Sequence, residues 1–238
     1  MKLDTSGISS DFPDFRVAMV VARDLSISPR RPSELDRVIA EAEERCRGDW
    51  AGRELSQIPG IAVWRRAYRA FGIRRTSYRC SVERLVKNVL AGRRLPEINV
   101  FVDLYNMVSL KHVLPLGADD LAQVAGDVAF RYSRPGDTFL DMSGEGGEEG
   151  CPMDNPPKQG EVVYADAEKV LCRRWNWRQD ARSLVTPATT AAIVTVQENG
   201  AGDLEGAVAE LAALLARFAG GVVSVAVADR NCPVVEVP

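Results

Sequence analysis

The first residues that could do chemistry lie on a segment that is otherwise apolar, from Asn99 to about Val113. At about 100° per residue on a helix, Asn99, Asp103 and Asn106 fall within an arc of about 60°, and Ser109 lies just beyond it. Amide and carboxylate groups in such a line can orient a ligand or a water molecule in a pocket. They can equally form a hydrogen-bonded strut that fixes the neighbouring backbone, because buried polar groups must find partners. Both interpretations stay open at this point.

A second group of functional side chains occupies the run from Val170 to Gln179, where tryptophans alternate with polar and basic residues. The run holds Trp175, Asn176 and Trp177, and its basic residues are Arg173, Arg174 and Arg178. Indole rings stack on bases or on apolar ligand rings, and guanidinium groups bind phosphate through paired hydrogen bonds. The alternative is a core strand over residues 170–177, with the indoles inward and the arginines outward. The pattern favours neither interpretation.

Several other kinds of catalytic chemistry lack the residues that they need. The chain has 238 residues and a single histidine, His112, which excludes a histidine-rich metal centre and relays of two imidazoles. It has no Gly-x-Gly-x-x-Gly, Walker A or Gly-x-Ser-x-Gly motif, which argues against nucleotide hydrolysis, dinucleotide redox chemistry and α/β-hydrolase chemistry. Five widely spaced cysteines indicate reduced thiols in a cytoplasmic protein, and no apolar run is long enough to span a membrane. We therefore expect neither a metal nor a cofactor.

The formal net charge of −3 hides a strong segregation of charge along the chain. From Arg53 to Arg94, eleven Lys and Arg stand against two Asp and Glu, a local charge of +9. From Asp137 to Glu168, nine acidic residues stand against one lysine, and residues 169–182 are basic again. Basic clusters of this size bind polyanions through phosphate contacts and counterion release. The residues expected to bind RNA are Arg65, Arg66, Arg69, Arg74, Arg75, Arg173, Arg174 and Arg178.

The elements that must position these residues change in type along the chain. Strands are expected over residues 15–25, 126–132, 137–142, 161–165, 170–177, 191–197 and 221–228, and helices over 33–47, 59–71, 77–91, 99–113 and 203–219. The acidic, glycine-rich segment 144–157 is expected to be an exposed loop. Helices first and strands after, with a late β-α-β alternation, predict the α+β class. We expect one compact domain with a mixed β-sheet core and flanking helices.

Several motifs resemble the B3/B4 domain of the bacterial phenylalanyl-tRNA synthetase beta subunit. They are INVFVDLYN from residue 98, LPLGADDL from residue 114, EVVYAD from residue 161 and VTPATT from residue 185. The run VLCRRWNWRQ, residues 170–179, is similar to a run of free-standing B3/B4 proteins. The likeness covers roughly residues 60–200. It implies a B3/B4-like domain over residues 59–238, with residues 1–58 forming an N-terminal strand and helix of the same unit.

In the synthetase, this domain is the editing module, which hydrolyses the ester of tyrosine mischarged on the tRNA for phenylalanine. The resemblance therefore implies a free-standing protein that binds aminoacyl-tRNA and hydrolyses a mischarged aminoacyl ester in trans. Asn106 matches the asparagine that lines the editing pocket, whereas the family's pocket histidine falls at Gly117 and its glutamate at Gln179. We expect Asn106 and Gln179 to orient the water or the carbonyl group, and Asp103 to hold the substrate ammonium.

The remaining site residues are expected to contact the substrate. They are Asn99, Ser109, Trp175, Asn176 and Trp177, with Arg174 or Arg178 on the terminal phosphate. The two tryptophans stand where the family keeps glycines, which suits a smaller or differently shaped aminoacyl group than tyrosine.

Two other functions stay open. A non-catalytic tRNA-binding or RNA-binding module would show a steep salt dependence of binding and no turnover. A small-molecule enzyme, or a binder of an amino-acid-like ligand, would have kept the pocket and abandoned RNA. The expected partner is the aminoacylated 3′ end of tRNA, with an aminoacyl-tRNA synthetase as a further candidate. Neither DNA nor a membrane is an expected partner.

Overall fold

The structure is a computed structural model that describes residues 1–74, 78–141 and 153–237. Arg75 and most of the acidic loop expected at residues 144–157 lie outside the described residues. The described helices are α1 (Ser33–Trp50), α2 (Pro59–Ala70), α3 (Ser81–Leu90), α4 (Val100–His112) and α5 (Leu204–Phe218). The described strands are β1 (Lys2–Asp4), β2 (Phe15–Leu25), β3 (Leu116–Asp120), β4 (Val128–Tyr132), β5 (Leu140–Asp141), β6 (Met153–Asp154), β7 (Val162–Ala165), β8 (Val170–Arg173), β9 (Arg178–Gln179), β10 (Ala192–Asn199), β11 (Gly220–Ala228) and β12 (Val234–Glu236).

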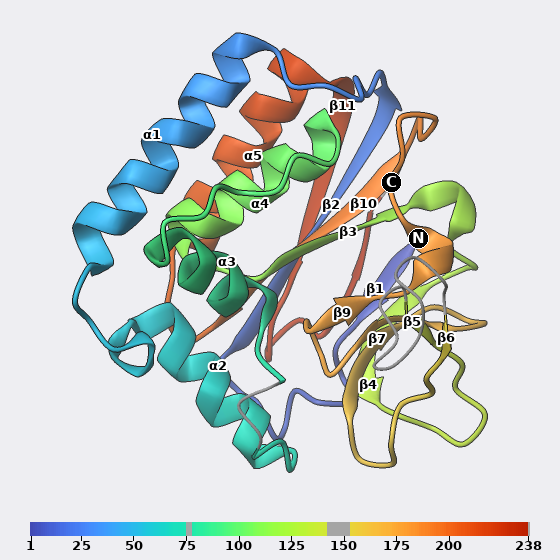
Figure 1. The fold of residues 1–238 in the computed structure, drawn as a ribbon. Helices are drawn as coiled ribbons and strands as arrows, with labels where there is room; N and C mark the ends of the chain where they lie inside the picture. The colour runs from blue at the N-terminus through green and yellow to red at the C-terminus, as the bar shows by residue number, and fades with distance from the viewer. Residues whose placement is uncertain (75–77, 142–152, 238) are drawn as a thin grey trace.

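A four-stranded antiparallel sheet in the order β11-β2-β10-β3 forms the centre of the molecule. β2 is an almost continuous apolar run because consecutive residues, from Val17 to Ala22, are buried, so both faces of the strand lie in the interior. As an inner strand it pairs along both edges, with Val20 opposite Val194 of β10 and Val225 of β11. α1, α4 and α5 lie together on one face of this sheet (Figure 1). Their apolar stripes and the sheet form one continuous hydrophobic core.

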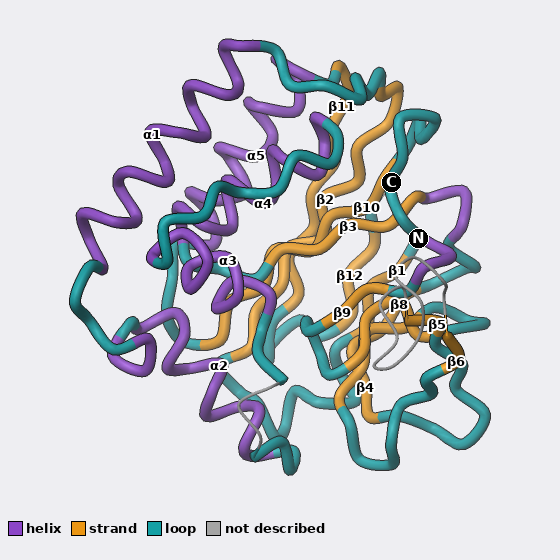
Figure 2. Tube along the Cα trace, in the orientation of Figure 1, coloured by secondary structure: helices purple, strands orange, loops and turns teal. Residues whose placement is uncertain are grey.

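A second sheet, in the order β12-β1-β4-β7-β8-β9, lies beside the lower part of the first one (Figure 2). β1 is parallel to β4 and the other pairs are antiparallel, so the sheet is mixed. β1 and β12 pair with each other, which brings the two ends of the described chain together (Figure 1). The α+β class with a mixed sheet and flanking helices is confirmed. The division expected at residue 58 stays a prediction.

The strand expected over residues 170–177 ends early, so the prediction of its last four residues was wrong. β8 stops at Arg173, and Arg174 and Trp175 have positive φ angles of 49° and 67°. Two consecutive left-handed residues form a tight turn that leads into β9. Trp175 stabilises this turn because its ring packs edge to face against Phe12 and Phe15, with centroids 4.6 and 4.9 Å apart.

β3 is a strand that the sequence did not indicate, because its residues, LGADD, are typical of a turn. It forms by pairing with the long apolar strand β10, from Leu116 opposite Val196 to Asp120 opposite Ala192. The two carboxylates of β3 are accommodated by side-chain donors: Asp119 accepts from Ser183, and Asp120 accepts from Thr189. Tertiary pairing therefore overrides local propensity at this strand.

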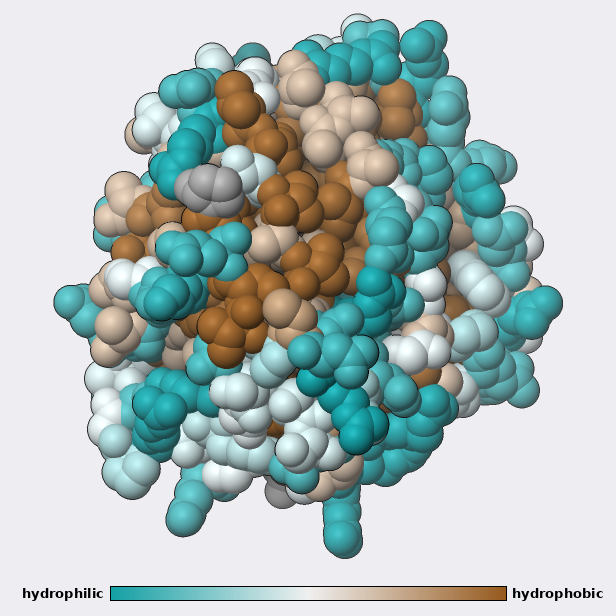
Figure 3. Space-filling model, turned by 180° about the vertical axis from the view of Figure 1, so that it is seen from behind, coloured by the Kyte–Doolittle hydropathy of each residue, from teal (hydrophilic) through white to brown (hydrophobic). Residues whose placement is uncertain are grey.

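β11 lies at the edge of the first sheet, and in the described residues its outer edge pairs with no strand. Its side chains Val222, Val225 and Val227 are 68%, 42% and 37% exposed. Seen from behind, the molecule presents an apolar surface near its middle (Figure 3). None of the described helices combines the length and the apolar character needed to cross a membrane.

Candidate functional site

One cavity collects many of the polar residues singled out in the sequence. It has a volume of about 130 Å³ and lies between α4, β3, β10 and the turn that joins β8 to β9. Asn106 on α4, Asn176 and Trp177 in the turn, and Gln179 on β9 all line it. Gly117 lines it too, so the three residues that the resemblance aligns with the family's pocket asparagine, histidine and glutamate share one cavity.

Asn106 is the polar residue of α4 that faces this cavity. It is half-buried on a helix whose other interior residues are mostly apolar, and no hydrogen bond joins its side chain to another described residue. Both the amide N–H groups and the carbonyl oxygen are therefore available to a ligand.

Two further polar groups in the cavity wall lack partners among the described residues. The hydroxyl groups of Ser81, at the start of α3, and Tyr164, on β7, are buried without a hydrogen bond. Burying a hydroxyl group without a partner costs about 1–3 kcal/mol, and such groups are rare in native proteins. Three unpartnered polar side chains on one cavity indicate a place built for a polar ligand.

Asp119 places a carboxyl group in the same cavity wall. Its side chain is 3% exposed, and its Oδ1 atom accepts hydrogen bonds from Ser183 Oγ at 2.6 Å and Gln179 Nε2 at 2.9 Å. Burial raises the pKa of Asp119 to about 7, and the two hydrogen bonds oppose this shift. A carboxyl group with a pKa near neutrality can accept and release a proton under physiological conditions.

Cys172, also in the cavity wall, does not supply a nucleophile. Burial raises the pKa of its thiol far above the usual value, and the nearby Asp119 raises it further. The reactive form of cysteine is the thiolate, so Cys172 stays a neutral, unreactive side chain at physiological pH.

A hydrogen-bonded network fixes the wall of the cavity at Asn176. Its amide group donates to Gln197 Oε1 at 3.0 Å and accepts from the hydroxyl group of Tyr68 at 2.9 Å. Gln197 in turn donates to Thr195 Oγ1 at 3.1 Å. Asn176 is therefore already partnered, and its position is set by α2 and β10.

Trp177 forms another part of the wall through stacking with arginines. The guanidinium carbon of Arg174 lies 4.2 Å from the Trp177 ring centre and 3.7 Å from that of Tyr78. Arg178 stacks on the same indole at 4.4 Å and forms an ion pair with Asp141 at 2.8 Å. These cation–π contacts hold Trp177 and Tyr78 against each other, with ring centres 5.2 Å apart.

The other three polar residues that the sequence singled out on or beside α4 do not line the cavity. Asp103 is fully buried, where its Oδ2 atom binds Arg31 Nε at 2.7 Å and its Oδ1 atom accepts from the backbone of Ile98. Asn99 caps the helix by accepting from the Val102 backbone at 3.0 Å. Ser109 donates to the carbonyl oxygen of Leu114. These three residues act as the hydrogen-bonded strut.

Three residues of the run from Val170 to Gln179 are likewise part of the interior. Trp175 is fully buried in the aromatic cluster around Trp64, and it does not line the cavity. Arg173 is 1% exposed and binds Glu161 through Nε at 2.8 Å, while Arg174 lies 3.4 Å from the same carboxylate. Neither guanidinium group is on the surface.

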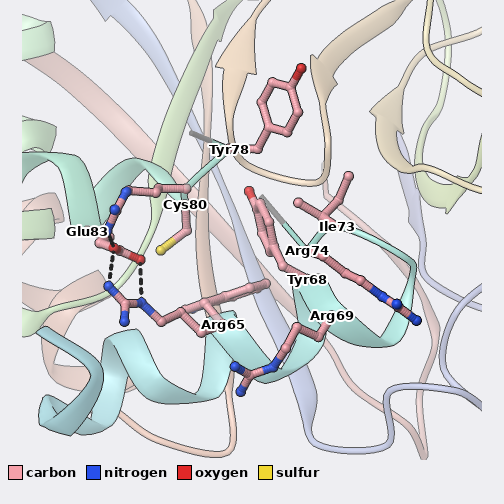
Figure 4. Close-up of a pocket in the computed structure, with 10 residues that line it drawn as sticks. Arg65, Tyr68, Arg69, Ile73, Arg74, Tyr78, Cys80 and Glu83 are labelled. Atoms are coloured by element: carbon pink, nitrogen blue, oxygen red, sulfur yellow. Dashed lines mark hydrogen bonds and ion pairs between the residues drawn. The ribbon is translucent and has the colours of Figure 1, made fainter. Parts of the chain in front are cut away.

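Three of the expected RNA-binding arginines, on α2 and just after it, lie instead at a second pocket, between α2 and α3 (Figure 4). Arg65, Arg69 and Arg74 line it, together with Arg79. This α2–α3 pocket has a volume of about 110 Å³. Arg66 is exposed on α2 but does not line the pocket.

The described residues contain no group of three or more His, Cys, Asp or Glu side chains that could hold a metal ion. The histidine lies at the end of α4, where His112 Nε2 is 2.7 Å from Glu210 on α5. It does not line the cavity or the α2–α3 pocket.

Asp119, Ser81 and Tyr164 are site residues that the sequence did not single out. Asp119 stands in a run that looks like a turn, and only the pairing of β3 with β10 turns it towards the cavity. Ser81 and Tyr164 belong to a helix and a strand with ordinary patterns. The paired aspartates of LGADD were the one available signal.

Comparison with known proteins agrees with the resemblance drawn from the motifs. The family model of the B3/4 domain matches residues 63–198, which is more than half of the chain. No curated protein matches the sequence. Among solved structures, an N-terminal fragment of the phenylalanyl-tRNA synthetase beta-subunit from Pyrococcus horikoshii is similar, with a TM-score of 0.44 and 12% identity. The match covers 93% of this chain and 50% of the fragment, so the chain spans about half of that fragment's length.

The matched residues 63–198 include every residue that lines the cavity. They extend from Val63 on α2 to Glu198 near the end of β10. The chain belongs to the B3/4 domain family.

Proposed function

We propose that the cavity binds the aminoacylated 3′ end of an RNA and hydrolyses the aminoacyl ester. The observation that carries this proposal is the convergence of the unpartnered groups of Asn106, Ser81 and Tyr164 on a cavity that also holds the buried carboxyl group of Asp119. A substrate with complementary polar groups would relieve the cost of these unpaired groups. Membership of the B3/4 family and the arginine-rich pocket beside the cavity support an RNA as the carrier of the ester.

In the proposed reaction, a water molecule attacks the carbonyl carbon of the ester while the Asp119 carboxylate accepts its proton. The amide N–H of Asn106 donates to the carbonyl oxygen, which becomes negatively charged in the tetrahedral intermediate. The bond from the carbonyl carbon to the ribose oxygen then breaks, and the proton on Asp119 passes to that oxygen. The products are the free amino acid and the RNA 3′ end, and the carboxylate is regenerated.

The neutral state of Cys172 supports water as the nucleophile. An aminoacyl ester is already activated, so a positioned water and a donor for the oxyanion are sufficient to lower the barrier by several kcal/mol. The reaction needs neither a covalent intermediate nor a cofactor.

We assign the substrate ammonium to Gln179 rather than to Asp103. The Nε2 group of Gln179 donates to the carbonyl oxygen of Ala118 and to Asp119, which leaves its Oε1 atom to accept from the ammonium. Asp103 is engaged by Arg31 and is outside the cavity lining.

Trp177 in the cavity wall supports an amino acid with a smaller or differently shaped side chain than tyrosine. The indole ring of Trp177 lines the same cavity as Gly117, which the resemblance aligns with the family's histidine. A panel of aminoacyl groups would rank the accepted side chains.

The test is deacylation of a panel of mischarged tRNAs by the purified protein. We expect hydrolysis of at least one aminoacyl group, and a loss of rate of about 100-fold or more in Asn106→Ala, the scale observed when one oxyanion donor is removed. Gln179→Ala is expected to weaken substrate binding, because it removes the acceptor for the ammonium group.

Asp120→Asn is the matched control for Asp119→Asn. Asp120 is the next residue of β3, but it does not line the cavity and accepts from Thr189 and the Ala122 backbone. Equal rates in the wild type, Asn106→Ala and Asp119→Asn would refute the site even if activity were present. Binding of every tRNA without hydrolysis would instead favour the non-catalytic RNA-binding module.

A further inference from the structure

We propose that the α2–α3 pocket binds one nucleotide of a single-stranded RNA. Arg69 and Arg74 would hold its phosphate, and its base would contact Tyr68, Ile73 and Tyr78. The assignment of this nucleotide to the RNA that carries the ester rests on the proposed function. The binding of a mononucleotide to the pocket does not rest on the proposed function, and it can be measured separately.

The charge in the pocket is the first observation in favour of a phosphate. Four arginines, Arg65, Arg69, Arg74 and Arg79, line it with a single carboxylate, that of Glu83. Glu83 is 1% exposed and binds Arg65 Nη2 at 2.6 Å (Figure 4). It also binds Arg79. The buried carboxylate is therefore neutralised by two guanidinium groups.

Arg69 and Arg74 supply the positive charge of the pocket that Glu83 does not neutralise. Both are exposed at the rim of the pocket, and neither forms a hydrogen bond or an ion pair with another described residue. Two unpaired guanidinium groups on one pocket can bind the oxygens of a phosphate through charge-assisted hydrogen bonds.

The walls of the pocket are the second observation, because they suit a flat ring. Tyr68 and Ile73 come from α2 and the segment that follows it, and Tyr78 precedes α3 (Figure 4). The Tyr78 ring is held in place by Arg174, whose guanidinium carbon is 3.7 Å from its centre. Aromatic walls beside a basic rim are the combination with which proteins bind single-stranded nucleic acids.

The position of the pocket relative to the cavity is the third observation. The α2–α3 pocket and the cavity are separated by side chains that contact one another. Tyr68 in the pocket donates to Asn176 in the cavity wall, and Tyr78 packs edge to face on Trp177. The consecutive residues Cys80 and Ser81 line the pocket and the cavity respectively. A nucleotide in the pocket therefore lies next to whatever occupies the cavity.

The direct test is calorimetric binding of AMP and of CMP to the full chain at low salt. We expect a single site, and a loss of affinity of about tenfold or more in the double variant Arg69→Ala/Arg74→Ala, as two charge-assisted hydrogen bonds are removed. Arg66→Ala is the matched control, because it removes an exposed arginine of the same helix that does not line the pocket. We expect its affinity to equal that of the wild type.

Binding of inorganic phosphate and of an acidic peptide, each compared with AMP, distinguishes a nucleotide site from a site for any anion. We expect inorganic phosphate alone to bind more weakly than AMP, since it makes no contact with the aromatic walls. Equal binding of phosphate and AMP, equal competition by an acidic peptide such as oligoglutamate, or undiminished AMP binding by Arg69→Ala/Arg74→Ala would each overturn the proposal.

A second measurement separates this proposal from the proposed hydrolysis. With aminoacyl-tRNA as the substrate, Arg69→Ala/Arg74→Ala is expected to raise KM, whereas an aminoacyl ester of adenosine, which has no phosphate, is expected to react at the wild-type rate. An equal effect on both substrates would contradict the pocket's role. If the wild type hydrolyses neither ester, the proposed function fails, and mononucleotide binding still decides whether the pocket is a nucleotide site.

Discussion

Asp119 combines burial, two hydrogen bonds and a place in the cavity wall. The hydrogen bonds from Ser183 and Gln179 both go to Oδ1, and they orient the carboxyl group. Burial dominates its electrostatics, so the carboxyl group changes its protonation state near neutral pH instead of near pH 4.

The titration of Asp119 gives a prediction that does not depend on activity. Because its pKa in the folded state lies above that of an exposed aspartate, the protonated form favours folding. This contribution is complete below a pH of about 4 and is lost as the pH rises through about 7. Relative to Asp119→Asn, which does not titrate, the wild type is expected to lose free energy of unfolding between about pH 4 and pH 7.

Urea denaturation of both proteins across this pH range measures the difference. Asp120→Asn serves as the control, because Asp120 is on the same strand and does not line the cavity. A constant difference between the wild type and Asp119→Asn across the range would contradict the raised pKa.

The pair of Asp103 and Arg31 carries a second prediction at this scale. Asp103→Ala leaves the guanidinium group of Arg31, whose side chain is 4% exposed, without its carboxylate. We expect the free energy of unfolding to fall by about 3–5 kcal/mol, the cost of breaking a buried ion pair by removing one partner. Asp36→Ala removes a half-exposed carboxylate 3.4 Å from the same arginine and is expected to cost under about 1 kcal/mol.

Denaturant titration of the two variants compares them directly. If Asp103→Ala abolished ester hydrolysis while unfolding like the wild type, Asp103 would belong to the active site and not to the framework.

The helices are the elements that position the cavity, and α2 approaches the end of α4 closely. Val113, which follows α4, has a φ of 53° and lies against Gly60 in the first turn of α2. A Cβ atom on Gly60 would lie 2.9 Å from Val113 Cγ1 and still closer to the Val113 carbonyl oxygen. Only glycine permits this approach.

Gly60→Ala is therefore expected to destabilise the protein by about 1–3 kcal/mol, because both backbones must shift to relieve the contact. Gly48→Ala, near the end of α1, is the matched control. A Cβ atom there meets nothing within 4 Å, so alanine is expected to stabilise the helix by about 0.5–1 kcal/mol. Thermal unfolding measures the midpoint temperature of each variant. A shift of both midpoints in the same direction would contradict this account.

The elements differ in how far the sequence predicted them. The helices and the long strands β2, β10 and β11 were found because their periodicity or apolar runs are strong and local. β3 was missed because its stability comes from pairing with β10, which a local pattern does not contain. The turn at Arg174 and Trp175 was missed because neither residue type favours a positive φ, and the aromatic cluster that stabilises it comes from distant segments.

The residues of the candidate site also differ in how far the sequence predicted them. The helical spacing placed Asn99, Asp103 and Asn106 on one side of α4, but it could not tell which of them faces a cavity. Only Asn106 does so, because Arg31 and Val185 reach Asp103 and Asn99 from other parts of the chain. The periodicity of one helix does not reveal the elements that pack against it.

At the scale of the whole molecule, the charged segments largely neutralise one another. Glu161 and Asp141, from the acidic residues 137–168, form ion pairs with Arg173 and Arg178, from the basic residues 169–182. Of the eight arginines expected from the sequence to bind RNA, Arg66, Arg69 and Arg74 are exposed and form no ion pair with another described residue. The set of arginines free to bind RNA is therefore smaller than those eight.

This reduction predicts a shallow dependence of RNA binding on salt. With three arginine–phosphate contacts, the slope of log affinity against log salt concentration is expected to be about −2, since each contact with a single strand contributes about −0.7. The eight arginines expected from the sequence would give a slope near −6 on the same scale. Binding of tRNA measured over a range of salt concentrations distinguishes the two values.

The unpaired edge of β11 has a consequence for the behaviour of the protein in concentrated solution. The strand, GGVVSVAVA, has nine residues with no charge and no proline, the features that usually prevent strands of different molecules from pairing. Intermolecular association through this strand is expected to limit solubility. Val225→Lys, at a position already 42% exposed, is expected to raise the concentration at which light scattering detects aggregates, without a change in thermal stability.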